Sequence, residues 1–244
     1  MSSTDEQKFN AVMASINQAL GTDGLGLTDN GESKLNYSEG AKNLMEELSN
    51  QKEAQLDEEL KEVQEFLESN QLEGENLSEF ISASKSEEGI VLTIKDLVLF
   101  SSGKAEVKSS AKDLLDKLAP LIENKGSNVR VEGHTDNVQV GAESEYKDNW
   151  ELSTARAANV VDFILQQKMI DASKISIAGY AEHKPVAKND TDANKAKNRR
   201  VDIILISNFK EAEKKAEEAI EKKEQAEKKA ENTKDDKKEE KKNN

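Results

Sequence analysis

The sequence predicts an α+β domain in which a mixed four-stranded sheet is covered on one face by helices. Two observations predict this class. Segments with the periods of strands and helices follow one another in the order β-α-β-α-β-β. A helical segment also separates two of the strands, so at least one connection is of the crossover type. The domain is expected to span residues 89–206, after a helical linker and before a charged helical or disordered tail.

Four short apolar runs are the expected strands of this sheet: residues 90–95, 129–133, 174–179 and 200–206. The last run is almost continuous in Val, Ile and Leu, which favours a central position in the sheet. Residues 79–83 are also β-prone and precede a polar stretch that ends in Gly89. A hairpin between this run and residues 90–95 is therefore expected.

Two segments have the period of helices that pack on a sheet. In residues 109–123 apolar side chains recur at three- and four-residue steps, and Pro120 is expected to bend or end this helix. Residues 152–168 form the clearest helical pattern in the chain, with Val160, Val161 and Ile164 among the apolar positions. Both segments are expected to cover the same face of the sheet.

Before the domain, residues 41–88 are expected to form an acidic helical linker or dimerisation segment and a first strand. Its helix carries an apolar stripe with steps of four, three and four, made by Leu56, Leu60, Val63 and Leu67. This spacing suits a dimer seam or, equally, a helix that lies on the following domain. Too few heptads are present to choose between the two.

The two ends of the chain have different patterns. Residues 1–20 contain apolar side chains at helical spacing, which predicts a short amphipathic helix that packs on its own protein or docks on a partner or a membrane. Residues 21–40 are rich in Gly, Asn, Asp and Ser and are expected to be a flexible linker. Residues 207–244 are a Lys/Glu-rich tail, expected to be a solvated helix that fades to disorder.

Composition and charge exclude several classes of protein. The chain has 244 residues, of which 35% are hydrophobic, enough for one core of ordinary size. Cysteine is absent, which excludes disulfides, thiol nucleophiles and cysteine zinc sites. The net charge of −14 arises in residues 1–88, with 20 acidic and 6 basic side chains, whereas residues 89–209 carry 17 of each. Because no basic stripe exists, nucleic acid is not an expected partner.

Membrane and export segments have recognisable sequence patterns, and neither pattern is present. No stretch approaches the roughly 18 consecutive apolar residues that a membrane span requires. The first residues, MSSTDEQKF, contain neither the basic region nor the apolar region of an export signal. The sequence as it stands is therefore not expected to span a membrane or to direct its own export.

The two histidines, His134 and His183, limit the acid–base and metal chemistry of the chain. A hydrolytic triad also needs an orienting group and an oxyanion hole, and no G-x-S-x-G nucleophile motif occurs. His134 and Asp136 lie two positions apart, but no third ligand follows at a recognised zinc spacing. Neither a catalytic site, a metal site nor a cofactor is predicted.

The most informative charged residues are Asp136, in a turn after a strand, and Arg156, early in the next helix. Asn149 precedes this helix and Ser153 lies in its first turn, where free backbone N–H groups attract an anion. A guanidinium binds a carboxylate through two hydrogen bonds, and a carboxylate binds an ammonium. Arg156 and Asp136 together therefore fit the zwitterionic head of an amino acid. A structural ion pair between Asp136 and Arg156 explains the same residues equally well.

Five separated motifs resemble one known family. VLFSSGKAEV, VEGHTDN, NWELSTARAANVV, ISIAGYAEHKP and NRRVDIIL stand in the order and at the spacing of OmpA-like peptidoglycan-binding domains. HTDN followed by NWELS is similar in particular to the MotB family of flagellar motor stator proteins. The resemblance covers about half of the chain, and its specificity comes from the agreement of several distant motifs.

The resemblance implies both a site and a function. By position, Asp136 and Arg156 match the family residues that hold the amino and carboxyl groups of diaminopimelate in the peptide stem of the cell wall. The rest of the family's binding surface matches Thr135, Asn149, Leu152 and Arg199. The implied function is non-catalytic binding of peptidoglycan that anchors a flagellar stator to the wall. The alternative is an envelope tether that is not involved in motility.

The resemblance also implies partners and a location. Peptidoglycan is the expected ligand, and a homodimer is expected because the family dimerises through the domain and the helix before it. The family's membrane span and its ion-carrying Asp are missing here, so a MotA-type partner subunit is expected only if a transmembrane helix precedes Met1. Residues 4–20 would then resemble the plug of an unassembled stator. The expected location is the extracytoplasmic side of the cell envelope.

Overall fold

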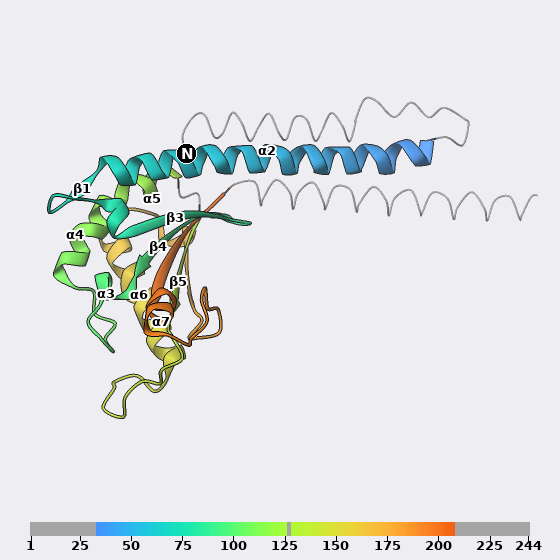
Figure 1. The fold of residues 1–244 in the computed structure, drawn as a ribbon. Helices are drawn as coiled ribbons and strands as arrows, with labels where there is room; N and C mark the ends of the chain where they lie inside the picture. The colour runs from blue at the N-terminus through green and yellow to red at the C-terminus, as the bar shows by residue number, and fades with distance from the viewer. Residues whose placement is uncertain (1–32, 126–127, 208–244) are drawn as a thin grey trace, which may run out of the picture. The chain divides into compact units, whose positions relative to one another are not determined.

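A computed structural model describes residues 33–125 and 128–207 of the chain, with elements labelled as in Figure 1. Residues 54–207 belong to one compact unit and residues 33–53 to another. The predicted helix within residues 1–20, residues 21–32 of the predicted linker and the tail beyond residue 207 lie outside the described residues.

The centre of residues 54–207 is a mixed sheet of five strands in the order β3-β4-β7-β5-β6 (Figure 1). The strands are β3 (Ile81–Ser86), β4 (Gly89–Lys95), β5 (Asn128–His134), β6 (Ile175–Gly179) and β7 (Arg200–Ile206). The β5–β6 pair is parallel, and the β3–β4, β4–β7 and β5–β7 pairs are antiparallel. The run rich in Val, Ile and Leu, β7, is the central strand, as its sequence predicts.

The mixed α+β fold agrees with the sequence prediction, but the sheet has five strands rather than four. The additional strand is β3, the first strand of the predicted hairpin, which pairs with β4 from Ile81 opposite Ile94 to Ser86 opposite Gly89. The side chains of β3 alternate weakly, with Ile81 buried and Ser82 exposed. Backbone pairing with β4 thus extends the sheet through a strand that contributes few apolar side chains.

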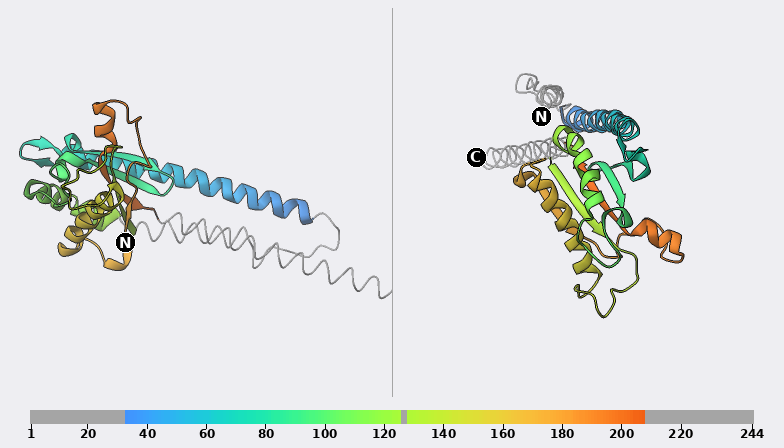
Figure 2. Two further views of the ribbon diagram at one scale, coloured as in Figure 1. Left: turned by 90° about the horizontal axis from the view of Figure 1, so that it is seen from below. Right: turned by 90° about the vertical axis from the view of Figure 1, so that its left-hand side faces the viewer.

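Helices α4 (Ser109–Lys117), α5 (Ala119–Lys125) and α6 (Asn149–Gln166) lie on one face of the sheet (Figure 2). The predicted bend at Pro120 is present, because α4 ends before Leu118 and Pro120 lies in the first turn of α5. Proline has no N–H and clashes with the preceding turn inside a helix, but it fits a first turn. Leu114, Leu115 and Leu118 are fully buried at this bend.

Short elements complete the unit. They are α3 (Asp96–Leu99), α7 (Asp192–Asn198), the 3₁₀ turns η1 (Leu77–Glu79) and η2 (Ala172–Lys174), and a two-stranded ribbon of β1 (Gln71–Leu72) and β2 (Glu75–Asn76). Both α3 and α7 stand beside strand ends: α3 follows β4, and α7 ends two residues before β7 begins.

The two faces of the sheet differ in polarity because side chains alternate along each strand. On the helix-covered face, Leu92 and Val131 flank Ile203 on the central strand, and all three are fully buried. One residue further along, Thr93 and Glu132 flank Asp202 on the opposite face. The sheet therefore has an apolar face under the helices and an opposite face that carries polar and charged groups.

Helix α2 (Ser33–Ser69) decides between the two alternatives for the apolar stripe. Leu56, Val63 and Leu67 are only 5%, 0% and 1% exposed, and they belong to the core formed by the sheet and its helices. Leu60 packs at the edge of the same core. This stripe lies on the following domain of its own chain, so the expected use of residues 56–67 as a dimer seam is not what the structure contains.

The predicted flexible linker is shorter than expected, because residues 33–40 are helical. Polar residues and Gly40 suggested a loop here. A single Gly within a helix costs only about 1 kcal/mol relative to Ala, which is too little to end a helix of 37 residues. The helix therefore continues through a segment whose composition alone favours a linker.

The burial of α2 leads to a stability prediction. We expect Leu67→Ala to lower the free energy of unfolding by about 2 to 5 kcal/mol, because it empties a fully packed position. Leu97→Ala, at a leucine that is 59% exposed, should change it by less than about 0.5 kcal/mol. Urea unfolding at two protein concentrations measures both effects. A loss at Leu67 that varies with protein concentration would instead place this side chain in a contact between copies.

Candidate functional site

A cavity of about 250 Å³ lies where β5 ends, β7 begins and α6 begins. The sequence-predicted site residues all line it: Thr135, Asp136, Asn149, Leu152, Arg156 and Arg199. Asp96 and Leu97, from α3, contribute to the same lining. The structure thus brings together, from distant parts of the sequence, the whole set of residues predicted for the site.

Two glycines allow the start of α6 to lie directly on the sheet. A Cβ at Gly133 of β5 would lie 2.0 Å from the Ser153 carbonyl oxygen, and one at Gly179 of β6 would lie 2.1 Å from Thr154 Oγ1. Neither position can hold a side chain unless the backbone shifts. Ser153 is fully buried at this contact and accepts a hydrogen bond from the Ala181 N–H at 3.1 Å. This contact sets the position of Arg156, one turn further along α6.

The N-terminus of α6 is occupied by the chain's own carboxylates. The Asp148 side chain caps the helix by accepting from the Glu151 N–H at 2.9 Å, and Glu151 Oε2 accepts from the Lys147 N–H at 2.6 Å. Because of this cap, α6 begins at Asn149, earlier than predicted. The cap also takes up part of the helix end that was expected to attract an anion, so the positive groups of the cavity are Arg156 and Arg199.

Asp136 and Arg156 each have a different partner. Asp136 pairs with Arg199, and its Oδ1 also accepts from the Val138 N–H at 2.9 Å. Arg156 Nη2 lies 3.1 Å from Asp96 Oδ1, and Arg156 Nε donates to the Lys104 carbonyl at 2.9 Å. The structure therefore does not contain the alternative ion pair between Asp136 and Arg156. Two other pairs, Asp136 with Arg199 and Asp96 with Arg156, line the same cavity.

Asp96 is a site residue that the sequence reasoning missed. It is buried at the start of α3, and its backbone N–H donates to the Arg199 carbonyl at 3.0 Å. Burial raises the pKa of the Asp96 carboxyl, against the opposing effect of Arg156. Burial likewise lowers the pKa of Arg156, against the opposing effect of Asp96. An acidic residue directly after a strand, in the sequence KD, was the signal available for finding it.

The cavity therefore contains two carboxylates and two guanidinium groups in a poorly solvated place. Arg156 is 3% exposed, and its guanidinium carbon lies 5.2 Å from the centre of the Phe100 ring. The two ion pairs, Asp136 with Arg199 and Asp96 with Arg156, balance the charges that line the cavity. A zwitterionic ligand can bind among these pairs without changing the net charge of the cavity, because it brings one carboxylate and one ammonium.

The uncharged site residues hold the loop that follows β5. Asn149 Nδ2 lies 3.0 Å from the Val138 carbonyl and 3.3 Å from the Asp136 carbonyl, and Thr135 Oγ1 donates to the Asp136 carbonyl at 2.9 Å. Leu152 is buried and supplies an apolar part of the wall. These contacts fix the orientation of the Asp136 backbone, so the carboxylate has a defined direction.

Asn198, just before Arg199, is another functional residue that the sequence reasoning did not single out. It is fully buried, and its Oδ1 accepts from the backbone N–H groups of Val186 and Ala187 at 2.9 and 3.0 Å. Its Nδ2 donates to the Ala187 carbonyl at 2.8 Å. Asn198 thereby ties the loop after β6 to the start of β7 and fixes the backbone from which Arg199 reaches the cavity.

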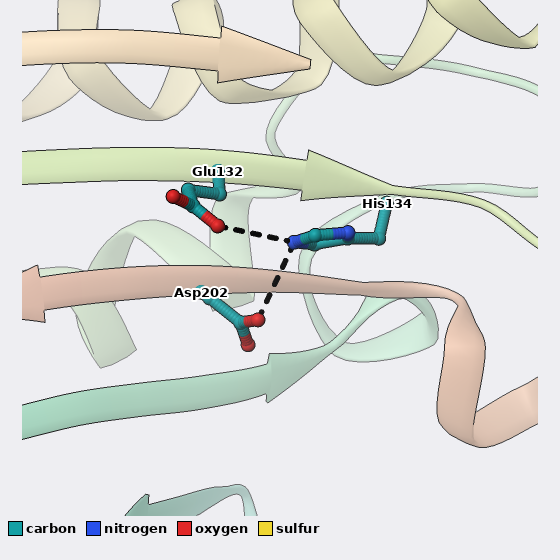
Figure 3. Close-up of side chains that lie close together, drawn as sticks. All are labelled: Glu132, His134 and Asp202. Carbon is teal, nitrogen blue, oxygen red and sulfur yellow. Dashed lines mark ion pairs between the residues drawn. The ribbon is translucent and has the colours of Figure 1, made fainter. Parts of the chain in front are cut away.

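A second polar cluster contains Glu132, His134 and Asp202 (Figure 3). It lies on the face of the sheet opposite the helices α4, α5 and α6, which is called the open face below. His134 Nε2 lies 3.6 Å from Glu132 Oε2 and 3.4 Å from Asp202 Oδ2. The spacing of His134 and Asp136 in the sequence suggested two metal ligands side by side, but Asp136 lines the cavity instead. Glu132 and His134 share a face by the period of two in β5, but the pairing with β7 that brings in Asp202 is not visible in the sequence.

The Glu132 carboxylate is strongly stabilised in this cluster. Burial alone would raise its pKa, but the neighbouring His134 imidazole and the Arg130 guanidinium outweigh burial and hold the pKa at about 2. Arg130 Nε donates to Glu132 Oε1 at 2.6 Å. The side chain is therefore a carboxylate at any pH at which the protein is expected to work.

The comparisons with known proteins agree with the fold. Residues 99–199 match the OmpA family, which defines the class of this domain. The chain is 33% identical over 205 residues to the uncharacterized protein YtxE of Bacillus subtilis, with 84% of this chain and 78% of that protein covered. It is 31% identical over 221 residues to motility protein B of the same organism, with 84% and 81% covered.

A solved structure points the same way. A MotB-like protein from Desulfovibrio vulgaris matches with a TM-score of 0.59 and 30% identity, over 67% of this chain and 96% of that one. Together with the relatives from Bacillus subtilis, this match identifies the family: the chain belongs to the motility protein B family, whose OmpA-family domain it carries. Among the helices in the described part of the chain, none has the length and apolar character needed to cross a bilayer.

The depressed pKa of Glu132 predicts acid sensitivity. A carboxyl whose folded pKa lies below its ordinary value of 4.5 stabilises the fold above that value, and the stabilisation is lost as the pH falls toward about 2. We expect this group to contribute on the order of 3 kcal/mol between neutral pH and pH 2.

Glu132→Gln should therefore flatten the fall in unfolding free energy between neutral and acid pH. The matched control is Glu123→Gln, at an exposed position of α5, which should leave the fall unchanged. Urea unfolding across this pH range measures both. An equally steep fall in Glu132→Gln would show that other carboxyls cause the acid sensitivity.

Proposed function

We propose that this protein binds peptide stems of peptidoglycan without catalysis and so anchors a flagellar motor stator to the cell wall. The observation that carries the proposal is the cavity in which Asp96, Asp136, Arg156 and Arg199 converge, in a chain of the motility protein B family. The proposal includes an extracytoplasmic location in the cell envelope and, if a transmembrane helix precedes Met1, a MotA-type partner subunit.

The proposed ligand group is the amino-acid head of diaminopimelate, which carries both an ammonium and a carboxylate. Its carboxylate would bind Arg156, whose guanidinium has donors beyond the Nε and Nη2 atoms that contact Lys104 and Asp96. Its ammonium would bind Asp136 and compete with Arg199 for that carboxylate. The ligand brings one charge of each sign, so its binding does not change the net charge of the cavity.

The expected affinity is modest. Hydrogen bonds to charged groups contribute about 1.5 to 3 kcal/mol each, and ordering of the ligand offsets much of their sum. A single site is therefore expected to bind no tighter than about micromolar. Several sites acting on one polymeric wall raise the apparent affinity by avidity.

A homodimer is part of the proposal, because it would place two sites on the same wall. Leu56, Val63 and Leu67 are buried in the core of their own domain, so these side chains are not the dimer contact. A dimer would have to form through other surfaces. Analytical ultracentrifugation of the full chain tests this part of the proposal separately from wall binding.

The site assignment predicts the outcome of sedimentation with purified peptidoglycan. We expect Asp136→Asn and Arg156→Ala to reduce the bound fraction at least tenfold, because each removes one charge that holds the zwitterion. Asp113→Asn, at an exposed position of α4, is the matched control and should bind like the unaltered chain. Circular dichroism first establishes that each variant is folded. If both site variants are folded and still sediment with the wall, the two residues serve only the structure.

The nature of the ligand head is tested with soluble stem peptides. We expect a peptide that contains diaminopimelate to displace the protein from peptidoglycan. A peptide with lysine at the same position, which lacks the side-chain carboxylate, should compete at least tenfold less well because Arg156 then has no ligand anion. Titration of the bound fraction with each peptide measures this ratio. Equal competition by the two peptides would contradict recognition of a zwitterionic head.

A further inference from the structure

The imidazole of His134 occupies an unusual environment on the open face of the sheet. The side chain is 1% exposed, and within the described part of the chain neither ring nitrogen has a hydrogen-bond partner. Polar atoms buried this deeply normally have one. The Nε2 atom nevertheless points between two carboxylate oxygens, Glu132 Oε2 and Asp202 Oδ2 (Figure 3).

The distances around Nε2 fit ligands of one ion better than a hydrogen bond. Separations of 3.6 and 3.4 Å exceed the roughly 2.7 to 3.2 Å of an N–H···O hydrogen bond. Two ligands of a tetrahedral zinc ion, each about 2.0 to 2.1 Å from the metal, are about 3.3 to 3.4 Å apart. All three ligand atoms lie within 4.8 Å of one another.

We propose that Glu132, His134 and Asp202 form a binding site for a divalent transition-metal ion of the zinc type. One imidazole and two carboxylates are a suitable ligand set for zinc, with a fourth position left for water. The imidazole nitrogen disfavours Mg²⁺ and Ca²⁺, which prefer oxygen ligands. This site is separate from the proposed wall-binding cavity and does not depend on that function.

The surroundings of the three ligands supply an outer shell. Arg130 Nε contacts Glu132 Oε1 at 2.6 Å, which leaves Oε2 for the ion, and Arg200 Nε contacts Asp202 Oδ2 at 2.8 Å. Thr93 Oγ1 donates to Asp202 Oδ1 at 2.7 Å. Hydrogen bonds of this kind orient carboxylate ligands in metal sites. The carboxylates are therefore held in place before an ion arrives.

The local charge permits a cation. Arg130 is shared between Glu132 and Glu88, so with Asp202 three carboxylates face two guanidinium groups. Lys184, over the Tyr180 ring, is exposed and therefore screened by solvent.

The site is expected to be weaker than a structural zinc site. His134 Nδ1 faces no hydrogen-bond acceptor in the described residues, and the ring stacks on Tyr180 at 5.4 Å between centres. Loss of such an outer partner typically weakens metal binding 10- to 100-fold, by the general behaviour of these sites. One of the three ligands, Asp202, also lines a cavity of about 390 Å³ on the open face of the sheet.

The test uses the untagged full chain, freed of metal with a chelator and titrated with Zn²⁺ by calorimetry in excess Mg²⁺. The excess Mg²⁺ suppresses loose binding to a chain of net charge −14. We expect saturable uptake of one Zn²⁺ per chain, because the three ligands form a single site. In NMR spectra, the ring signals of His134 should shift on addition of Zn²⁺.

The chain offers a matched control, since it contains two histidines and His183 is exposed. His134→Gln should bind Zn²⁺ at least tenfold more weakly, whereas His183→Gln should bind like the unaltered chain. Glu132→Gln, which keeps the shape of the side chain, is a second variant in case His134→Gln does not fold. The proposal is overturned by the lack of saturable uptake in excess Mg²⁺, or by equal uptake in folded His134→Gln and Glu132→Gln.

Discussion

The close contact between the start of α6 and the sheet is the constraint on which the candidate site depends. Gly133 and Gly179 remove the side chains that would hold the helix away, and the Ser153 backbone occupies the space that a Cβ at Gly133 would need. The ends of β5 and β7 and the first turns of α6 then converge on one cavity. A larger spacing would separate Arg156 from Asp96 and open the buried pair to water, which would weaken both the fold and the site.

The charged groups that line the cavity are arranged in two ion pairs. In the cavity, Asp136 pairs with Arg199 and Asp96 with Arg156. Such pairs add little net stability, because desolvation offsets most of the attraction, but removal of one partner leaves an uncompensated charge. A site of this type is suited to a ligand that carries both signs of charge. Such a ligand adds one positive and one negative charge, so the net charge of the cavity stays the same.

Much of the fold was predictable because its signals are local. The apolar run of β7 indicated the central strand, Pro120 indicated the bend between α4 and α5, and the motifs around Asp136 and Arg156 indicated the cavity. What the sequence left open depends on contacts between distant segments. The stripe from Leu56 to Leu67 is equally apolar whether it faces a partner or its own domain. Likewise, Asp202 meets His134 only through the register of β5 and β7.

The alternation of side chains along the strands separates the two polar clusters while keeping them close in sequence. Arg199 enters the cavity, and the next residue, Arg200, contacts Asp202 on the open face of the sheet. On β5, His134 belongs to the open face, whereas Asp136 beyond the strand end belongs to the cavity. Changes at Arg200 or His134 can therefore reach the cavity only through the backbone, whose position Asn198 and Gly133 already fix. An ion held between β5 and β7 would restrain the end of β5 and the start of β7, which border the cavity. It would therefore act on the cavity through the spacing of these two strands and not through the charge of the ion.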